Sequence, residues 1–257
     1  MFDYKKHIYE LDVFGFTIVK KVISKEYAQI FKQKLIEAET IEKEKFKDNP
    51  HYGNWHLLNL CTCDNFFLDF LDNEVMYKMY SHFLGQSCIL YTYCSTTVYP
   101  DRITRNHEIH NDAPKSIPNY ISGLQMTMAL DDFTHENGAS LYLPGSHRMS
   151  EKPCDETFYK YAVKVARESG DVLFFNPSVW HKAGENKTDK IRYGFSTYAV
   201  RSFMKQRFDF PRIIAEETAQ GLSERVKGFL GYNVRIPVTL EDFFVDPEKR
   251  LYKPNQD

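Results

Sequence analysis

The chain has 257 residues, 42% of them hydrophobic, and a formal net charge of −2. The nearly balanced charge, without a long lysine or arginine block, argues against a nucleic-acid partner. No apolar signal core opens the sequence and no run approaches the ~20 apolar residues of a membrane span, so we expect a soluble, cytoplasmic protein that does not bind membranes.

The first 86 residues are predicted to form a largely helical buttress. A short strand over 15–20 precedes a helix that begins near Ser24, a residue type suited to an N-cap. A second helix is expected over 65–84, where apolar residues recur at helical spacing and Gly85 suits its C-terminal end. We interpret the apolar faces of both helices as core packing.

After residue 86 the pattern changes to short runs rich in β-branched and aromatic residues, separated by Pro, Gly and Asn. The runs cover 87–99, 121–130, 139–143, 163–166, 171–175 and 191–200. Many short strands after two helices predict a mainly β fold with flanking helices, a jelly-roll barrel. We expect one domain spanning 1–257, with its core at about 87–200 and a C-terminal extension over 201–257.

A candidate metal site combines His110, Asp112 and His181. His110-Asn111-Asp112 is the one His-x-Asp or His-x-Glu tripeptide of the chain, although alone it would fit an ordinary polar surface. Residues i and i+2 of an extended segment point to the same side, so His110 and Asp112 can hold one ion. With His181 from a distant strand they form the ligand set that holds non-haem Fe(II) and leaves other positions open. This combination points to oxygen chemistry.

Arg192 follows His181 after a turn over 184–189 and starts the next strand. Fe(II) with two imidazoles and one carboxylate has a net charge of about +1, and a bound 2-oxoglutarate dianion would change it to about −1, so a buried partner is needed. Arginine stays protonated and offers a planar fork that matches a carboxylate. We therefore expect the Arg192 guanidinium to point into the same barrel.

Several short motifs follow one another in a specific order and spacing. They are Tyr9-Glu10 with Gly15 to Lys20, Phe83-Leu84-Gly85, His110-Asn111-Asp112, Ala129-Leu130-Asp131-Asp132, Glu136-Asn137-Gly138-Ala139, Pro144-Gly145-Ser146-His147, Gly170 to Phe175, Trp180-His181 and Arg192. In this order they resemble the phytanoyl-CoA dioxygenase family of Fe(II)/2-oxoglutarate-dependent oxygenases, over residues 4–200. The resemblance implies a cupin-like double-stranded β-helix that uses Fe(II), the cosubstrate 2-oxoglutarate and O2.

The same resemblance implies roles for single residues. His110, Asp112 and His181 would bind iron, and Arg192 would pair with the distal carboxylate of 2-oxoglutarate. The strand 124–130 usually helps to hold the cosubstrate in such enzymes, and alternation puts Gln125 and Thr127 on one face of it. Both are our candidates for cosubstrate binding. Ala183 stands where some relatives have a hydroxyl that also contacts 2-oxoglutarate, and alanine has no such group.

Candidate substrate-binding residues lie in two segments outside the predicted strands. Trp55, His56 and Asn59 precede the second helix, in a stretch that approaches the open side of the barrel in relatives. Asn106 and His107 lie in the long loop over 100–120, a kind of segment that is often functional. Core packing is as open an interpretation for Trp55 as substrate binding, whereas for His107 we favour an ordinary loop role over pocket lining.

The resemblance implies a dioxygenase that oxidises a C–H bond of a small-molecule substrate and releases succinate and CO2. Halogenating relatives lack the carboxylate of Asp112, so its presence favours hydroxylation, or a desaturation or ring formation. We favour a small biosynthetic metabolite over a fatty acyl-CoA. Two alternatives stay open: an inactive jelly-roll binding protein, and a cupin-like metal-dependent hydrolase or isomerase. The oligomeric state is not predicted.

Overall fold

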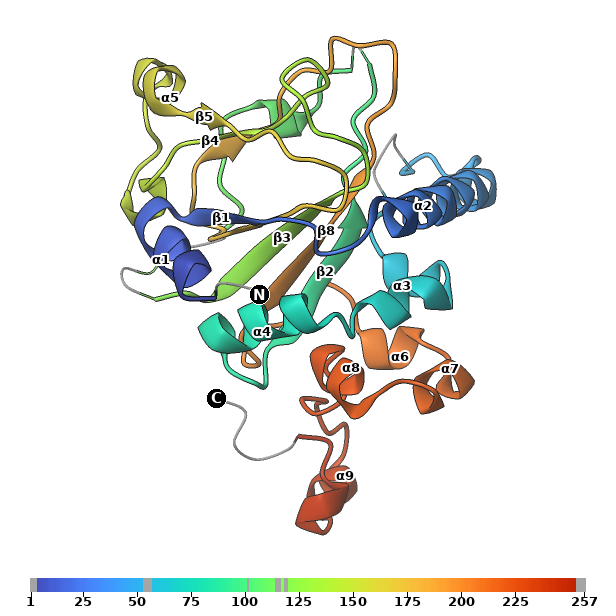
Figure 1. Ribbon diagram of the computed structural model, residues 1–257. Coiled ribbons are helices and arrows are strands. Elements are labelled where there is room, and N and C mark those ends of the chain that lie inside the picture. The colour runs from blue at the N-terminus through green and yellow to red at the C-terminus, as the bar shows by residue number, and fades with distance from the viewer. Residues whose placement is uncertain (1–3, 53–56, 101, 114–116, 118–119, 253–257) are drawn as a thin grey trace. The chain divides into compact units, whose positions relative to one another are not determined.

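The computed structural model describes residues 4–52, 57–100, 102–113, 117 and 120–252 (Figure 1). The chain divides into two compact units, Met1–Leu57 with Cys94–Ser196 and Leu58–Tyr93 with Thr197–Asp257. The expectation of one domain with its core at about 87–200 stays a prediction. In the described part of the chain, no helix is both long and apolar enough to cross a membrane.

The strands form two sheets, and their order within each sheet differs from their order along the chain. One sheet has five strands in the order β1-β6-β3-β8-β2, and the other has three in the order β5-β4-β7. The strands are β1 (Phe16–Val19), β2 (Ile89–Ser95), β3 (Gly123–Ala129), β4 (Leu141–Tyr142), β5 (Val163–Lys164), β6 (Val172–Phe175), β7 (His181–Lys182) and β8 (Gly194–Val200). Each predicted run contains one of these strands. β7 lies outside all of them, because two residues are too few to produce a periodic pattern.

The core of the first unit includes side chains from both sheets. Tyr142 of β4 meets Phe175 of β6 with ring centroids 5.3 Å apart and Phe16 of β1 at 5.4 Å. Every residue of β6 is buried, as expected for a strand that is covered on both faces. Figure 1 shows β4, β5 and the helix α5 (Asp155–Tyr161) lying together. The inner side chains of both sheets therefore share one apolar core.

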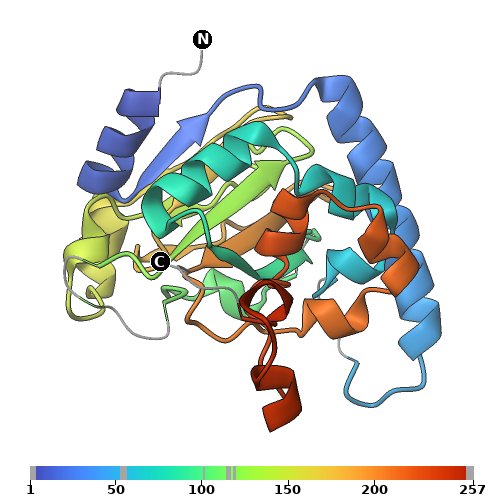
Figure 2. The same ribbon diagram turned by 90° about the horizontal axis from the view of Figure 1, so that it is seen from below.

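The longer helix of the first unit begins where the sequence predicted. In α2 (Lys25–Phe46), Ser24 is the N-cap and its side chain accepts from the Tyr27 N–H at 3.1 Å. The apolar face of α2 packs inward, and Phe31 stacks on Phe195 with ring centroids 4.2 Å apart. The shorter helix α1 (Tyr4–Phe14) lies beside β1 (Figure 2).

The second unit is mainly helical. Its helices are α3 (Asn65–Phe70), α4 (Glu74–Leu84), α6 (Phe210–Ile213), α7 (Glu216–Gln220), α8 (Glu224–Phe229) and α9 (Leu240–Phe243). The single helix predicted over 65–84 is therefore wrong, because the chain breaks it between α3 and α4. The Asn73 side chain accepts from the Val75 and Met76 N–H groups at 3.1 Å and starts a new helix. Such capping competes with continuation of the preceding helix.

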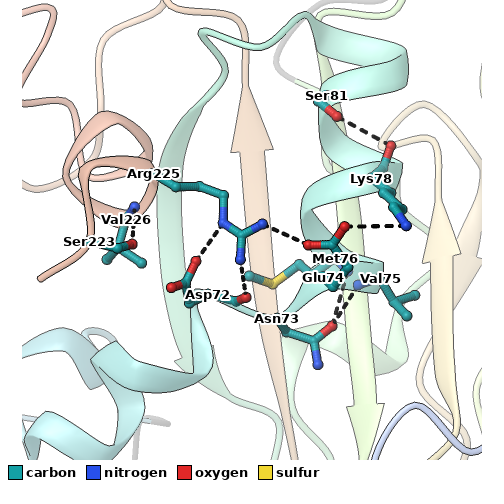
Figure 3. A network of polar contacts seen from close by, with 10 residues as sticks. All are labelled: Asp72, Asn73, Glu74, Val75, Met76, Lys78, Ser81, Ser223, Arg225 and Val226. Carbon is teal, nitrogen blue, oxygen red and sulfur yellow. Dashed lines mark hydrogen bonds and ion pairs between the residues drawn. The ribbon is translucent and has the colours of Figure 1, made fainter.

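Arg225 of α8 connects this helix to the junction of α3 and α4 (Figure 3). Its Nε donates to Asp72 Oδ1 at 2.5 Å, Nη2 donates to the Asp72 carbonyl at 2.6 Å, and Nη1 donates to Glu74 Oε2 at 2.8 Å. Glu74 also pairs with Lys78 at 3.2 Å. The hydrogen bond from Arg225 is the main cause of the lowered pKa of Glu74. One side chain thus joins α8 to the α3–α4 junction through three hydrogen bonds.

The substitution Arg225→Gln is expected to lower the free energy of unfolding by about 1 kcal/mol, since the ion pairs are partly exposed but multiply hydrogen-bonded. Urea denaturation followed by circular dichroism measures this change. The control is Arg212→Gln, whose partner Asp209 lies 3.7 Å away on the surface. That variant should stay within about 0.5 kcal/mol of the wild type. Equal effects of both substitutions would contradict the prediction.

Candidate metal centre

His110, Asp112 and His181 come together in the first unit, as the sequence predicted for a metal site. Each offers one ligand atom, and these atoms lie within 4.8 Å of one another. His110 Nε2 is 3.7 Å from Asp112 Oδ1, and His181 Nε2 is 3.5 Å from Asp112 Oδ2. The three groups thus converge on one point from two separate segments.

Backbone pairing holds the two histidines side by side. The His110 N–H donates to the His181 carbonyl at 3.0 Å, and the His181 N–H donates back at 2.8 Å. Next to them, the Asp112 N–H donates to the Pro177 carbonyl at 2.8 Å. On its other side, His181 lies opposite Tyr142 in the β4–β7 ladder. The ligand positions are therefore fixed by the main chain rather than by side-chain packing alone.

Both imidazoles are held in the tautomer that a metal ligand needs. Nδ1–H of His110 donates to the Glu108 carbonyl at 2.8 Å, and Nδ1–H of His181 donates to the Val179 carbonyl at 2.9 Å. A carbonyl only accepts, so the proton sits on Nδ1 and the lone pair of Nε2 is free for an ion. Burial lowers the pKa of His181, which favours the neutral form that binds metal.

Gln125 orients the carboxylate of the cluster. Its Nε2 donates to Asp112 Oδ2 at 2.6 Å. The β3–β6 register pairs Gln125 with Phe175 and Thr127 with Leu173, which puts both polar residues on one face of β3. The contact to Asp112 gives Gln125 a role next to the metal ligands. The role in cosubstrate binding that we expected for Gln125 stays a prediction.

Arg192 is buried close to a second buried arginine, Arg167, with exposed fractions of 4% and 6%. Their Cζ atoms lie 3.8 Å and 4.6 Å from the centre of the Phe133 ring. Among the described residues, neither guanidinium forms an ion pair with a carboxylate, and neither Nε has a hydrogen-bond partner. Burial lowers the pKa of Arg192 to about 9 and that of Arg167 to about 10, so both stay charged at neutral pH.

Tyr142 interacts both with the metal cluster and with the two arginines. Its ring stacks on His181 at 5.1 Å with an interplanar angle of 9°. Burial raises the pKa of Tyr142, while the charges of Arg167 and Arg192 act against this rise. Neither Tyr142 nor Arg167 was predicted from the sequence. A charged residue between Val165 and the Gly170 turn was a usable signal for Arg167, whereas Tyr142 looked like any core aromatic.

Asn106 and His107 lie in the loop before the cluster. Asn106 is exposed, and its carbonyl accepts from the Ala183 N–H at 2.7 Å. His107 is buried, and its Nδ1 accepts from the Thr104 N–H at 3.0 Å. The Nε2 of His107 is also buried, without a hydrogen-bond partner in the described part of the chain. Substrate binding by these two residues stays a prediction.

The remaining predicted substrate residues belong to the segment before α3. Asn59 lies in the second unit, where its side chain caps a short 3-10 helix by accepting from the Cys61 N–H at 3.2 Å. Trp55 and His56 lie outside the described residues. The predicted substrate contacts of all three therefore stay untested.

Two solved structures of other proteins have a fold similar to that of this chain. HygX from Streptomyces hygroscopicus, solved with nickel and 2-oxoglutarate bound, aligns with a TM-score of 0.64 and 15% identity, over 79% of this chain and 88% of HygX. SnoK, a non-heme alpha ketoglutarate dependent carbocyclase from nogalamycin biosynthesis, aligns with a TM-score of 0.60 and 18% identity, over 76% of this chain and 83% of SnoK. These similarities confirm the predicted jelly-roll fold class.

Residues 11–194 match the Phytanoyl-CoA dioxygenase (PhyH) family, and the chain belongs to this family. Protein Rv1501 of Mycobacterium tuberculosis is 33% identical over 147 residues, which are 57% of this chain and 54% of the relative. Dioxygenase af480 of Aspergillus fumigatus is 23% identical over 241 residues, which are 88% of this chain and 77% of the relative. The match thus spans about half of the mycobacterial relative's length. The family predicted from the motifs is confirmed.

The substitution Gln125→Leu is expected to weaken metal affinity about tenfold, because Asp112 loses the hydrogen bond that orients its carboxylate. Titration calorimetry with Mn(II) at neutral pH measures this affinity. Gln33→Leu, on the exposed face of α2, is the matched control and should bind Mn(II) like the wild type. Wild-type affinity in the Gln125 variant would show that the contact does not support the site.

Proposed function

We propose that the chain is a non-haem Fe(II)/2-oxoglutarate-dependent dioxygenase in which His110, Asp112 and His181 bind the iron. The observation that carries this proposal is the convergence of two Nε2 atoms and one carboxylate, with both Nδ1–H groups tied to carbonyls. Two imidazoles and a carboxylate on one face are the donor set of Fe(II) oxygenases. HygX, with the same fold, has been solved with iron bound and with nickel and 2-oxoglutarate bound, which supports this choice.

The cosubstrate proposed for this site is 2-oxoglutarate, with Arg192 as the partner of its distal carboxylate. Arg192 is buried, charged and without a carboxylate partner among the described residues. A buried charge of this kind is unfavourable until an opposite charge joins it. A dianion that reaches both the metal and Arg192 would neutralise both.

Bound Fe(II) would supply the activation of O2 and the oxidation of a C–H bond, with release of succinate and CO2. The chain itself binds and orients. Gln125 holds the Asp112 carboxylate in one orientation. Tyr142 and Phe175 pack against His181 at ring distances of 5.1 Å and 5.2 Å and keep water from that side of the ligand. No acid or base residue is required for removal of hydrogen from carbon.

The reaction that we favour is hydroxylation, or a related C–H oxidation, of a small biosynthetic metabolite. With a metal bound, the Asp112 carboxylate would take the coordination position that a halide needs, which disfavours halogenation. Several relatives are named as dioxygenases, and SnoK is named as a carbocyclase from nogalamycin biosynthesis. They support a biosynthetic role and leave both hydroxylation and ring formation within the proposal.

Anaerobically Fe(II)-loaded protein is expected to convert 2-oxoglutarate to succinate after O2 is added, and small metabolites that bind as substrates should accelerate the conversion. Asp112→Ala and His181→Ala should reduce succinate to background, because each removes a proposed ligand. Succinate is quantified by mass spectrometry. Asp209→Ala, at an exposed position of the second unit, is the control. Absence of succinate with the wild type across a broad substrate panel would overturn the proposal in favour of a binding protein or a hydrolase.

The substitution Arg192→Gln is expected to weaken 2-oxoglutarate binding about 100-fold, about 2.7 kcal/mol, since a buried charge pair is lost. Mn(II) affinity should not change, because Arg192 is not a ligand. Calorimetric titration of the Mn(II)-loaded protein gives both values. Arg148→Gln, an exposed arginine paired with Asp12 at 3.4 Å, should behave like the wild type. Unchanged 2-oxoglutarate affinity in the Arg192 variant would exclude the proposed pairing.

A further inference from the structure

Arg167 is a buried arginine that belongs neither to the proposed metal ligands nor to the family motifs. Its main chain pairs with Phe133 through hydrogen bonds of 2.7 Å and 3.0 Å. Its Nη1 donates to the carbonyl and to Oγ1 of Thr127, at 2.7 Å and 2.8 Å. Within the described residues, no other nitrogen of this guanidinium has a hydrogen-bond partner, and its Nε is fully buried. Most of its donor capacity is therefore left for another group.

Two carboxylates interact electrostatically with the arginines, but both form hydrogen bonds with other groups. Asp171, whose charge raises the pKa of Arg167, accepts from the Lys21 N–H at 2.9 Å and from the Glu168 N–H at 3.1 Å. Asp171 therefore makes its hydrogen bonds with the backbone.

Asp131, whose charge raises the pKa of Arg192, likewise has other partners. It pairs with Lys32 at 2.6 Å through Oδ1 and accepts from the Tyr193 N–H at 2.8 Å through Oδ2. The protein thus satisfies both acids with other donors and leaves the two guanidiniums without a carboxylate of their own.

The two arginines also repel each other electrostatically. Both lie against the Phe133 ring, and the charge of Arg167 adds to burial in lowering the pKa of Arg192. Two like charges in a buried site are costly unless an anion joins them. A single carboxylate has two oxygens and can accept from two guanidiniums at once. The pair therefore fits an anionic group better than either arginine alone.

Tyr142 links this pair to the metal cluster. Its ring stacks on His181, and its hydroxyl is close enough to interact electrostatically with Arg167, Arg192 and Asp112. In the described part of the chain this hydroxyl has no hydrogen bond. A ligand that runs from the cluster to the arginines would pass a free O–H donor.

We propose that Arg167 is a second cation for the distal carboxylate of the cosubstrate, acting together with Arg192 and the Tyr142 hydroxyl. The proposal rests on the proposed function, because it assumes a 2-oxo acid at the metal. The second cation makes the site selective for a 2-oxo dicarboxylate over a 2-oxo monocarboxylate. Arg167 is then a binding residue for the cosubstrate and not only a support for Thr127.

The test compares two ligands of equal chain length, 2-oxoglutarate and 2-oxovalerate, which lacks the distal carboxylate. Calorimetry on Mn(II)-loaded wild type, Arg167→Gln and Arg167→Lys gives the ratio of the two affinities. Arg167→Gln is expected to weaken 2-oxoglutarate binding at least about tenfold and 2-oxovalerate binding less than about twofold. Arg167→Lys keeps the charge and should recover part of the ratio. A purely structural role would weaken both ligands equally, and that result would overturn the proposal.

Two further arms keep the test decisive. Tyr142→Phe keeps the ring on His181, so it should lower 2-oxoglutarate affinity about fivefold without changing Mn(II) affinity. Arg148→Gln should keep the wild-type ratio. If Arg167→Gln does not fold, as judged by its melting curve, the proposal is tested with Arg167→Lys and Tyr142→Phe. A wild type that binds no 2-oxoglutarate would overturn the proposed function itself, whereas a wild-type ratio in the folded Arg167 variants would overturn only the role of Arg167.

Discussion

The site depends on one antiparallel contact, the pair of backbone hydrogen bonds that His110 and His181 exchange. Residues directly opposite each other in a ladder point to the same face. The contact therefore brings two distant imidazoles together and also aims them in one direction. Tyr142 continues the same row on the next strand, since it lies opposite His181. Two ligands and the aromatic ring behind one of them thus follow from two adjacent pairings that share His181.

Strand β3 of the larger sheet contributes two polar side chains that contact the proposed site. Gln125 contacts the Asp112 carboxylate, whereas Thr127 contacts Arg167. Two residues of a strand span about 7 Å, so one face of β3 runs from the proposed metal end of the site to its cationic end. That span is on the scale of a short dicarboxylate. The polar residues of this otherwise apolar face therefore occur where the two ends of such a ligand would need them.

Patterns that repeat along the chain could be predicted from sequence. The helix start at Ser24 and most strands were found because capping and alternation are local, and the His110 and Asp112 pair was found because i and i+2 share a side. The break of the helix at Asn73 was missed, since an apolar period continues across it while a side-chain cap interrupts the backbone. Tyr142 and Arg167 were missed because only tertiary packing brings Tyr142 to His181 and Arg167 to Arg192, and neither belongs to a short motif.

The arginine pair has a consequence for the lifetime of the protein. Without an anion, two guanidiniums beside Phe133 repel each other inside the fold. A ligand that neutralises them binds only the native state and so reduces the fraction of molecules that open. Proteases act mainly on opened molecules. A dicarboxylate bound there as proposed would then slow proteolysis of the chain, even when no substrate is being oxidised.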